Sequence, residues 1–238
     1  MRQCPFSKSS SLSGGLEWGA SGHACQEWLM SASAIAENTW LQASWATFID
    51  LANNPAYTHA RFYYHDGWMR VEMAPVGRSH AQDNSLIAAI VLAWAIRSGQ
   101  RLWGLVNPTL RKAELAEAQP DLAYYLNEVR LPGRTNAPLD LAVYAPPDLV
   151  IEVSASTLND DLETKRRLYA QMGVGEYWVV DSRSSQVTIF VSQLSTQSQR
   201  SQVLPDLDTL VLHQALQIGQ AEGDAAAAQY ILGAKLEG

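Results

Sequence analysis

The chain has 238 residues, of which 47% are hydrophobic, and this is enough for one domain with a sizeable core. Its formal net charge of -7 gives no global attraction for nucleic acid, and its longest apolar run, LIAAIVLAWAI, is too short to span a bilayer. The only cysteines, Cys4 and Cys25, exclude a disulfide framework and a cysteine zinc site. These features predict a cytoplasmic protein without a membrane segment.

The N-terminal residues 1–35 are rich in Ser, Gly and Ala, which predicts a mobile extension. One hypothesis is that Met30 is the true start, because the patterned sequence begins only after it. A helical pattern starts near Trp40 and continues through Trp45 and Phe48. The first regular element is therefore expected shortly after this extension.

A β-hairpin and a helix are predicted next. Asp66-Gly67 separates the strand-like runs RFYYH and WMRVE, which is a strong signal for a two-residue hairpin turn. A helix is expected over 80–98, with one stripe formed by His80, Asn84, Ile87, Val91 and Trp94. His80 is a candidate because this stripe directs it toward the sheet, although a satisfied structural histidine is the alternative. Glu72 is expected to be a solvated, outward residue.

Two aspartates open short strand-like runs in the middle of the chain. Asp121 begins the run in QPDLAYYL, and Asp140 begins the run in PLDLAVYAPP. Asp121 follows a proline, so a turn or helix cap is its alternative role. The surrounding segment 101–135 contains several Lys and Arg residues and is expected to contact substrate or a second subunit.

The most informative strand is predicted over 148–153. Leu149, Ile151 and Val153 lie on one face, and Asp148, Val150 and Glu152 lie on the other. Both faces are largely apolar, which predicts a central strand covered on both sides. Because a buried carboxylate is costly unless it is paired or binds a metal, Glu152 is a candidate functional residue.

A helix follows this strand, with Ser156 or Thr157 as its N-cap and Gly173 at its end. Its core-facing stripe consists of Leu158, Leu162, Lys165, Tyr169 and Met172. Lys165 is therefore a second candidate functional residue. The alternative is that Lys165 and Glu152 form an ion pair with a structural role only. Two strands, EYWVVD and VTIFVS, are predicted after the helix.

Spacing limits which carboxylates can cooperate with Glu152. Asp148 lies about 13 Å from Glu152 along the same strand, which is too far to share one ion. A partner has to come from a neighbouring strand, about 5 Å away. Asp121 and Asp140 are the candidates. Asp140 and Asp148 are better explained as residues at the start of a strand than as ligands. Either would take the place of Asp121 as the partner of Glu152 only if the strand register differs from the one expected.

These segments together resemble the PD-(D/E)XK nuclease superfamily and, more closely, the restriction endonuclease family called Uma-two (Uma2). The matching segments follow the family's order: DGWMRVEMAPVGRSH, QPDLAYYL, PPDLVIEV, the helix from Lys165 to Tyr169, and GVGEYWVVD. The resemblance implies a mixed α/β (α+β) restriction-endonuclease-like core with a central mixed sheet flanked by helices. It places this nuclease-like domain over 36–200 and leaves 201–238 as a peripheral segment containing an Ala-rich helix.

The resemblance also implies the roles of the candidate residues. Asp121 corresponds to the first aspartate of the superfamily and Glu152 to its second acid, and both would bind Mg²⁺ or Mn²⁺. The superfamily's lysine normally stands two residues beyond the second acid, where this chain has Ser154. The resemblance therefore implies that the lysine has migrated to the helix as Lys165, with His80 near the site.

The predicted function is metal-dependent endonucleolytic hydrolysis of phosphodiester bonds, with DNA as the expected substrate. Because the chain is acidic, its affinity for DNA has to come from local basic residues and the metal. A homodimer would suit double-strand cleavage. Two other functions stay open: a catalytically degenerate nuclease fold that acts as a binding or regulatory module, and a hydrolase for a different phosphate ester.

Overall fold

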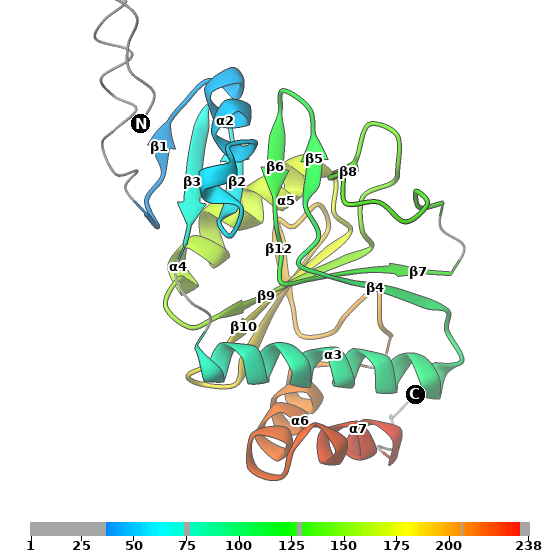
Figure 1. The fold of residues 1–238 in the computed structure, drawn as a ribbon. Helices are drawn as coiled ribbons and strands as arrows, with labels where there is room; N and C mark the ends of the chain where they lie inside the picture. The colour runs from blue at the N-terminus through cyan, green and yellow to red at the C-terminus, as the bar shows by residue number, and fades with distance from the viewer. Residues whose placement is uncertain (1–36, 74–76, 128–129, 206, 234–238) are drawn as a thin grey trace, which may run out of the picture. The chain divides into compact units, whose positions relative to one another are not determined.

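The computed structural model describes residues 37–73, 77–127, 130–205 and 207–233. The expected extension over 1–35 and the start at Met30 lie outside these residues. The described residues form a mixed α+β fold with two six-stranded sheets and flanking helices (Figure 1), which confirms the predicted fold class. None of the helices in these ranges is long and apolar enough to cross a membrane.

The central sheet has the strand order β12-β11-β10-β9-β7-β4. β9 runs parallel to β10 and antiparallel to β7, so the sheet is mixed, as predicted. The strand bounds are β4 Leu102–Val106, β7 Leu122–Leu126, β9 Leu149–Ser154, β10 Glu176–Asp181, β11 Gln186–Val191 and β12 Thr196–Ser198. All six residues of β9 are buried, which confirms that this strand is covered on both faces.

A second sheet has the strand order β1-β3-β2-β6-β5-β8. Its bounds are β1 Leu41–Gln42, β2 Arg61–His65, β3 Trp68–Glu72, β5 Leu110–Lys112, β6 Ala116–Ala118 and β8 Leu139–Asp140. The predicted hairpin joins β2 to β3, and both turn residues have positive φ, 49° at Asp66 and 80° at Gly67. Asn and Asp tolerate this left-handed conformation and Gly adopts it freely, so the dipeptide fixes the turn.

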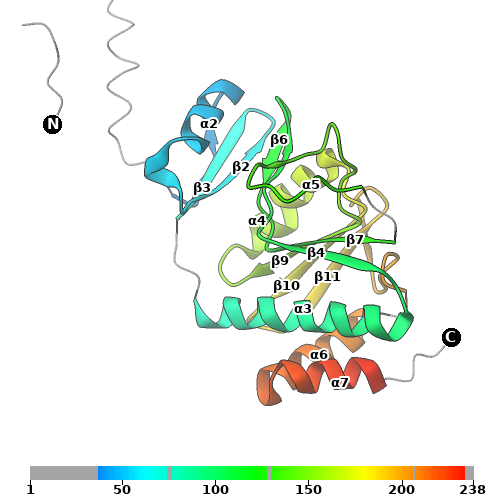
Figure 2. The same ribbon diagram turned by 45° about the vertical axis from the view of Figure 1, so that its right-hand side comes forward.

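The helices lie on both faces of the central sheet (Figure 2). The helical bounds are α2 Trp45–Ala52, the 3-10 turn η2 Pro55–Tyr57, α3 Arg78–Ser98, α4 Leu158–Asp160, the π turn η3 Asp161–Lys165, α5 Arg166–Met172, α6 Thr209–Glu222 and α7 Asp224–Gly233. α4, η3 and α5 follow one another without a break and correspond to the single helix predicted there. α6 and α7 pack against α3, so the C-terminal segment covers the outer side of that helix.

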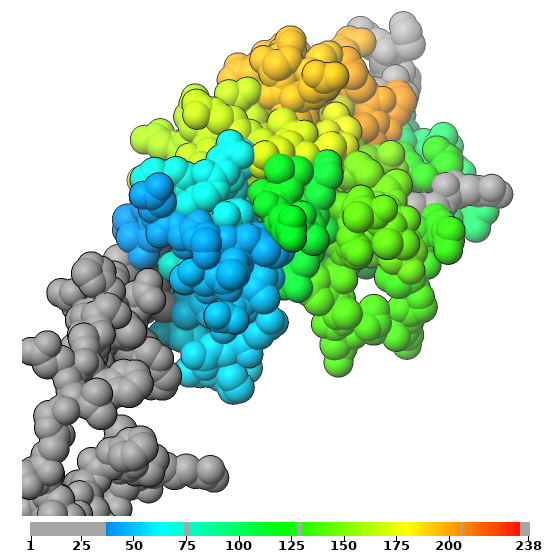
Figure 3. Space-filling model, turned by 90° about the horizontal axis from the view of Figure 1, so that it is seen from above, coloured from blue at the N-terminus to red at the C-terminus, as the bar shows by residue number. Residues whose placement is uncertain are grey.

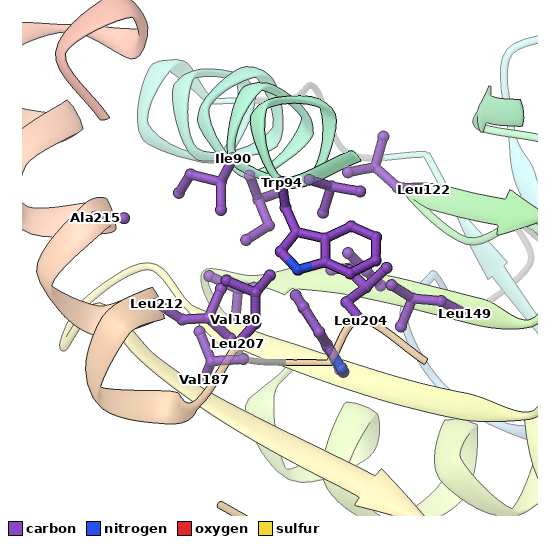
Figure 4. Packing of buried hydrophobic residues seen from close by; sticks show 14 of the residues in the cluster. Ile90, Trp94, Leu122, Leu149, Val180, Val187, Leu204, Leu207, Leu212 and Ala215 are labelled. Carbon is purple, nitrogen blue, oxygen red and sulfur yellow. The ribbon is translucent and has the colours of Figure 1, made fainter. Parts of the chain in front are cut away.

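One apolar core lies between α3 and the central sheet (Figure 4). Ile90 and Trp94 of α3 lie over Leu149 and Val180 of the sheet, while α6 contributes Leu212 and Ala215, as Figure 4 shows. The Trp94 indole N–H donates to the Pro205 carbonyl at 2.7 Å, so its polar atom is satisfied. This core fixes α3, and with it the direction of the helix's first turn.

A second core lies on the opposite face, between the sheet, α5 and the second sheet. Val150 and Tyr177 of the central sheet pack with Leu168, Tyr169 and Met172 of α5. In Figure 3 the blue and cyan atoms of the N-terminal strands adjoin the yellow-green atoms of the α4–α5 segment. The outcome is that β2, β3 and the helix carrying Lys165 converge beside the middle of β9.

Candidate active site

Glu152 lies in the middle of β9 and is 2% exposed. Strand alternation puts it on the same face as Val150, toward α5. The Tyr169 hydroxyl donates to its Oε1 at 2.6 Å, and the Lys165 Nζ lies 3.5 Å from the same oxygen. The carboxylate is therefore held from the helix side by one neutral donor and one cation.

Asp121 immediately precedes β7 and is 1% exposed. Leu122 pairs with Ile151 in antiparallel register, so Asp121 lies beside Glu152 across the two strands. The Val153 backbone N–H donates to Asp121 Oδ2 at 2.9 Å. Asp121, the candidate opening QPDLAYYL, is thus the aspartate on the neighbouring strand that spacing required.

His80 and Arg61 meet the other oxygen of Asp121. The His80 Nε2 lies 3.2 Å from Oδ1, and the Arg61 Nη1 donates to the same atom at 2.6 Å. His80 lies in the first turn of α3, which the core between α3 and the sheet directs toward β9. Arg61 opens β2 in the second sheet.

Lys165 is the last residue of the π turn and is 3% exposed. Its Nζ lies 3.0 Å from Asp161 Oδ1, 3.5 Å from Glu152 Oε1 and 3.6 Å from Glu72 Oε1. It also lies 4.4 Å from the centroid of the Tyr63 ring. Three carboxylates and a ring face thus enclose one ammonium, and π turns of this kind occur frequently at functional sites.

One cavity of about 850 Å³ joins these groups. Its lining includes all four residues that were predicted from the sequence to be catalytic, Asp121, Glu152, Lys165 and His80. The other ionisable residues that line it are His59, Arg61, Arg70, Glu72, Asp160, Asp161, Asp181 and Arg183. Ionisable residues form much of the lining, and its carboxylates outnumber its Lys and Arg side chains.

Asp140 and Asp148 do not line this cavity. The Asp148 Oδ2 accepts a hydrogen bond from the Leu126 N–H at 2.8 Å, at the far end of β7. The Asp140 Oδ1 accepts from the Ala142 N–H at 2.9 Å and so closes a local turn. Both carboxylates accept hydrogen bonds from backbone N–H groups at strand ends, which leaves Asp121 as the neighbour of Glu152.

The environment shifts the pKa of each central group. Burial disfavours the charged form of Asp121, but its hydrogen bond with His80 and the charge of Arg61 outweigh burial, so the pKa of Asp121 lies below its ordinary value. Burial raises the pKa of Glu152 well above its ordinary range, and the Lys165 charge offsets this only in part. The pKa of Lys165 is raised despite burial because Glu152 and the other anionic groups around it favour the ammonium. The surroundings therefore favour the ionised form of Asp121, whereas they favour the protonated form of Glu152 more than water does.

Three residues that line the cavity and contact the candidate residues were not expected at the site from the sequence. Arg61 and Asp161 contact the candidate residues directly, and Glu72 accepts from Arg70 Nε at 2.9 Å while facing Lys165. The expectation that Glu72 is solvated and outward is wrong, because the Lys165 helix packs beside its strand. Asp161 had a local signal, since it precedes Lys165 by four residues on a helix. Arg61 had none.

The donor chemistry fits a hard divalent cation. Asp121 and Glu152 offer carboxylate oxygens from adjacent strands, and Mg²⁺ commonly uses one or two carboxylates, with waters and phosphate oxygens completing its coordination. Within the described residues, no group of three or more His, Cys, Asp or Glu side chains is arranged to hold a metal ion.

Comparisons with known proteins identify a family for this chain. A family model named Uma2 and described as "Putative restriction endonuclease" matches residues 45–227. A crystal structure from Anabaena variabilis, described as that of a putative nuclease, is similar with a TM-score of 0.48 and 13% sequence identity, covering 79% of this chain and 99% of that one. No curated protein matches the chain.

Proposed function

The chain belongs to the Uma2 family, and from this we propose that it is a metal-dependent endonuclease that hydrolyses phosphodiester bonds, with DNA as its substrate and Mg²⁺ or Mn²⁺ as its cofactor. Family membership supports a nuclease. The metal and the deoxyribose substrate are the finer parts of the proposal, and they rest on the chemistry of the cavity.

One observation carries the proposal. Asp121, Glu152 and Lys165 come from β7, β9 and the following helix, and all three line the same cavity. The ammonium of Lys165 lies 3.5 Å from Glu152, and Asp121 is bonded to the backbone of the residue after Glu152. Two acids and a lysine on the wall of one cavity are groups that can support metal-dependent phosphodiester hydrolysis.

Each residue has a distinct role in this proposal. A divalent cation would supply charge neutralisation of the phosphate and a lower pKa for attacking water. Asp121 and Glu152 would hold it through hard oxygen donors. Lys165 would orient the water or stabilise the negative charge that develops on the phosphoryl oxygens. His80 would keep the Asp121 carboxylate in place through its Nε2.

Basic residues in the cavity lining would offset the acidic net charge of the chain locally, at the place where DNA has to bind. The chain carries -7 overall, so long-range attraction for DNA is weak. His59 and Arg183 are exposed residues of the cavity lining, and Arg61 is half-buried within it. Local basic groups of this kind are where the phosphate backbone would be held.

The decisive experiment compares cleavage by the natural chain with that by Glu152→Gln and Lys165→Ala. A panel of single- and double-stranded DNA and RNA is incubated with Mg²⁺, with Mn²⁺ and with excess chelator. Asp148→Asn is the matched control, because it removes a carboxylate from the other end of the same strand segment without touching the cavity. Circular dichroism and melting temperature report whether each variant folds.

The proposal requires cleavage that chelator abolishes, that Asp148→Asn retains and that both cavity variants lose while folded. Equal cleavage by all four proteins would reject the assigned residues. Cleavage of RNA alone would reject the DNA substrate but retain the hydrolytic site.

A binding or regulatory module is the second candidate, and one observation favours it. The central acids are already paired, Asp121 with Arg61 and His80, and Glu152 with Lys165 and Tyr169. Ser154 also occupies the place of the superfamily's lysine. This candidate predicts no cleavage of any nucleic acid in the panel and a melting temperature that does not respond to Mg²⁺ or Mn²⁺.

A further inference from the structure

Arg61 and His80 both reach the Asp121 carboxylate from partly exposed positions, with side chains 20% and 17% exposed. The Arg61 Nη1 donates to Asp121 Oδ1 at 2.6 Å, and its Nη2 donates to Asn107 Oδ1 at 2.7 Å. The guanidinium thus bridges the start of β2 to the loop between β4 and β5. Its side chain is 20% exposed, whereas that of Asp121 is 1% exposed, so Arg61 lies on the solvent side of the pair.

The acceptor capacity of Asp121 is almost used up. An ionised carboxylate offers about four acceptor positions, two on each oxygen. Oδ1 contacts both Arg61 and His80, and Oδ2 accepts from the Val153 N–H. A metal ion that binds Oδ1 has to replace one of its two partners.

Of these two partners, Arg61 is the one in direct conflict with a cation. Arginine does not lose its proton in proteins, so it cannot relieve repulsion from a divalent ion as a neutral histidine does. Two positive groups at one oxygen repel each other strongly in a buried place where the effective dielectric is low. The long side chain of Arg61 lines the cavity and has room to turn toward solvent.

We propose that Arg61 and a divalent cation compete for the Asp121 carboxylate, so that Arg61 closes the site until metal binding releases its guanidinium into the cavity. This inference rests on the proposed function, because it assigns Asp121 to the metal. Arg61 is a positioning residue here. Once released, its planar guanidinium group can donate two parallel hydrogen bonds to a phosphate.

The test measures binding of Mn²⁺ alone to the full chain by isothermal titration calorimetry. The variants are Arg61→Gln and Arg183→Gln. Arg183 lines the same cavity from the turn after β10 and is exposed, so its loss removes one positive charge without freeing Asp121. Asn107→Gly is a milder second variant, because it removes the other anchor of Arg61 and suits the positive φ of 50° at this position.

Arg61→Gln is expected to bind Mn²⁺ about tenfold to a hundredfold more tightly than Arg183→Gln, the range that one charge-assisted hydrogen bond represents. Asn107→Gly is expected to fall between the natural chain and Arg61→Gln. If Arg61→Gln folds and binds Mn²⁺ no more tightly than Arg183→Gln, competition is overturned. If Arg61→Gln does not fold, Asn107→Gly decides the matter in the same way.

Failure of this inference is separable from failure of the proposed function. Tighter Mn²⁺ binding by Arg61→Gln in a protein that cleaves no nucleic acid would support competition and overturn hydrolysis. Metal-dependent cleavage with unchanged Mn²⁺ affinity in Arg61→Gln would support hydrolysis and overturn competition. No detectable Mn²⁺ binding by the natural chain, Arg61→Gln or Asn107→Gly overturns both.

Discussion

The carboxylate of Asp121 is tied to β9 by the backbone N–H of Val153, which donates to its Oδ2 at 2.9 Å. Val153 directly follows Glu152, so this single bond sets the first candidate acid beside the second. The link runs between residues 32 positions apart and depends on the antiparallel register of β7 and β9. Any strand slip would break both the bond and the candidate site.

Asp121→Asn is expected to lower both stability and cleavage. The amide keeps the size of the side chain but loses the charge that Arg61 and His80 contact, at a cost of about 1–3 kcal/mol. Cleavage should fall by about a hundredfold. Because the pKa of Asp121 is lowered on folding, its stabilisation is present above about pH 4 and is lost as pH falls further. Urea unfolding at several pH values should therefore show the variant's deficit shrinking in acid, and a constant deficit would contradict this.

Lys165→Met is expected to be strongly destabilising on its own. It leaves the carboxylates of Glu152, Asp161 and Glu72 without their shared cation, and removal of one partner from a buried ion pair costs about 3–5 kcal/mol. The double variant Lys165→Met with Glu152→Gln should recover part of this loss. A double-mutant cycle by urea unfolding measures the recovery, and simple additivity of the two changes would speak against a direct pairing.

Tyr169→Phe tests the hydroxyl that donates to Glu152 Oε1 at 2.6 Å. Its loss should cost about 1–2 kcal/mol of stability, because a hydrogen bond to a buried carboxyl is removed. Tyr125→Phe is the control, since its hydroxyl donates to the Ala145 carbonyl at 3.2 Å and not to a candidate residue. Only Tyr169→Phe should also reduce cleavage. Equal cleavage by the two variants would remove Tyr169 from the site.

Single-stranded DNA is expected to be cleaved at least about tenfold faster than intact duplex, because a flexible single strand bends into a recessed site more readily than a stiff duplex. The basis is depth, since Asp121 and Glu152 are only 1% and 2% exposed at the bottom of the cavity. Oligonucleotides of identical sequence, with and without their complement, give the comparison. A preference for duplex would contradict this prediction and would show that the two acids are accessible to a duplex.

Glu176→Gln should destabilise the fold and leave the chemistry intact. The Glu176 carboxylate accepts from the Trp178 indole, from the Ser201 hydroxyl and from the N–H groups of Gln202 and Val203. An amide would turn a donor toward one of these groups, at a cost of about 1–3 kcal/mol. Thermal unfolding should report the loss, while cleavage by the folded fraction stays unchanged. A selective loss of cleavage would mean that this carboxylate communicates with the cavity.

The local pattern of the sequence predicted the elements that carry the site. Alternation along β9 separated Glu152 from Leu149, Ile151 and Val153, and the helical stripe put Lys165 on the face with Tyr169. Asp66-Gly67 fixed the hairpin of β2 and β3. These predictions hold because a strand has a period of two residues and a helix one near 3.6, so the facing of a side chain depends only on its near neighbours.

The tertiary structure decided which of these side chains meet. Spacing left Asp121 and Asp140 as the candidate partners of Glu152, and only the register of β7 against β9 selects Asp121. Arg61 and Glu72 had no local signal, because each reaches the cavity from the second sheet. Their roles depend on contacts of less than 4 Å between segments distant in sequence. Charge interactions of this kind are set by distance and burial, and these are properties of the assembled fold.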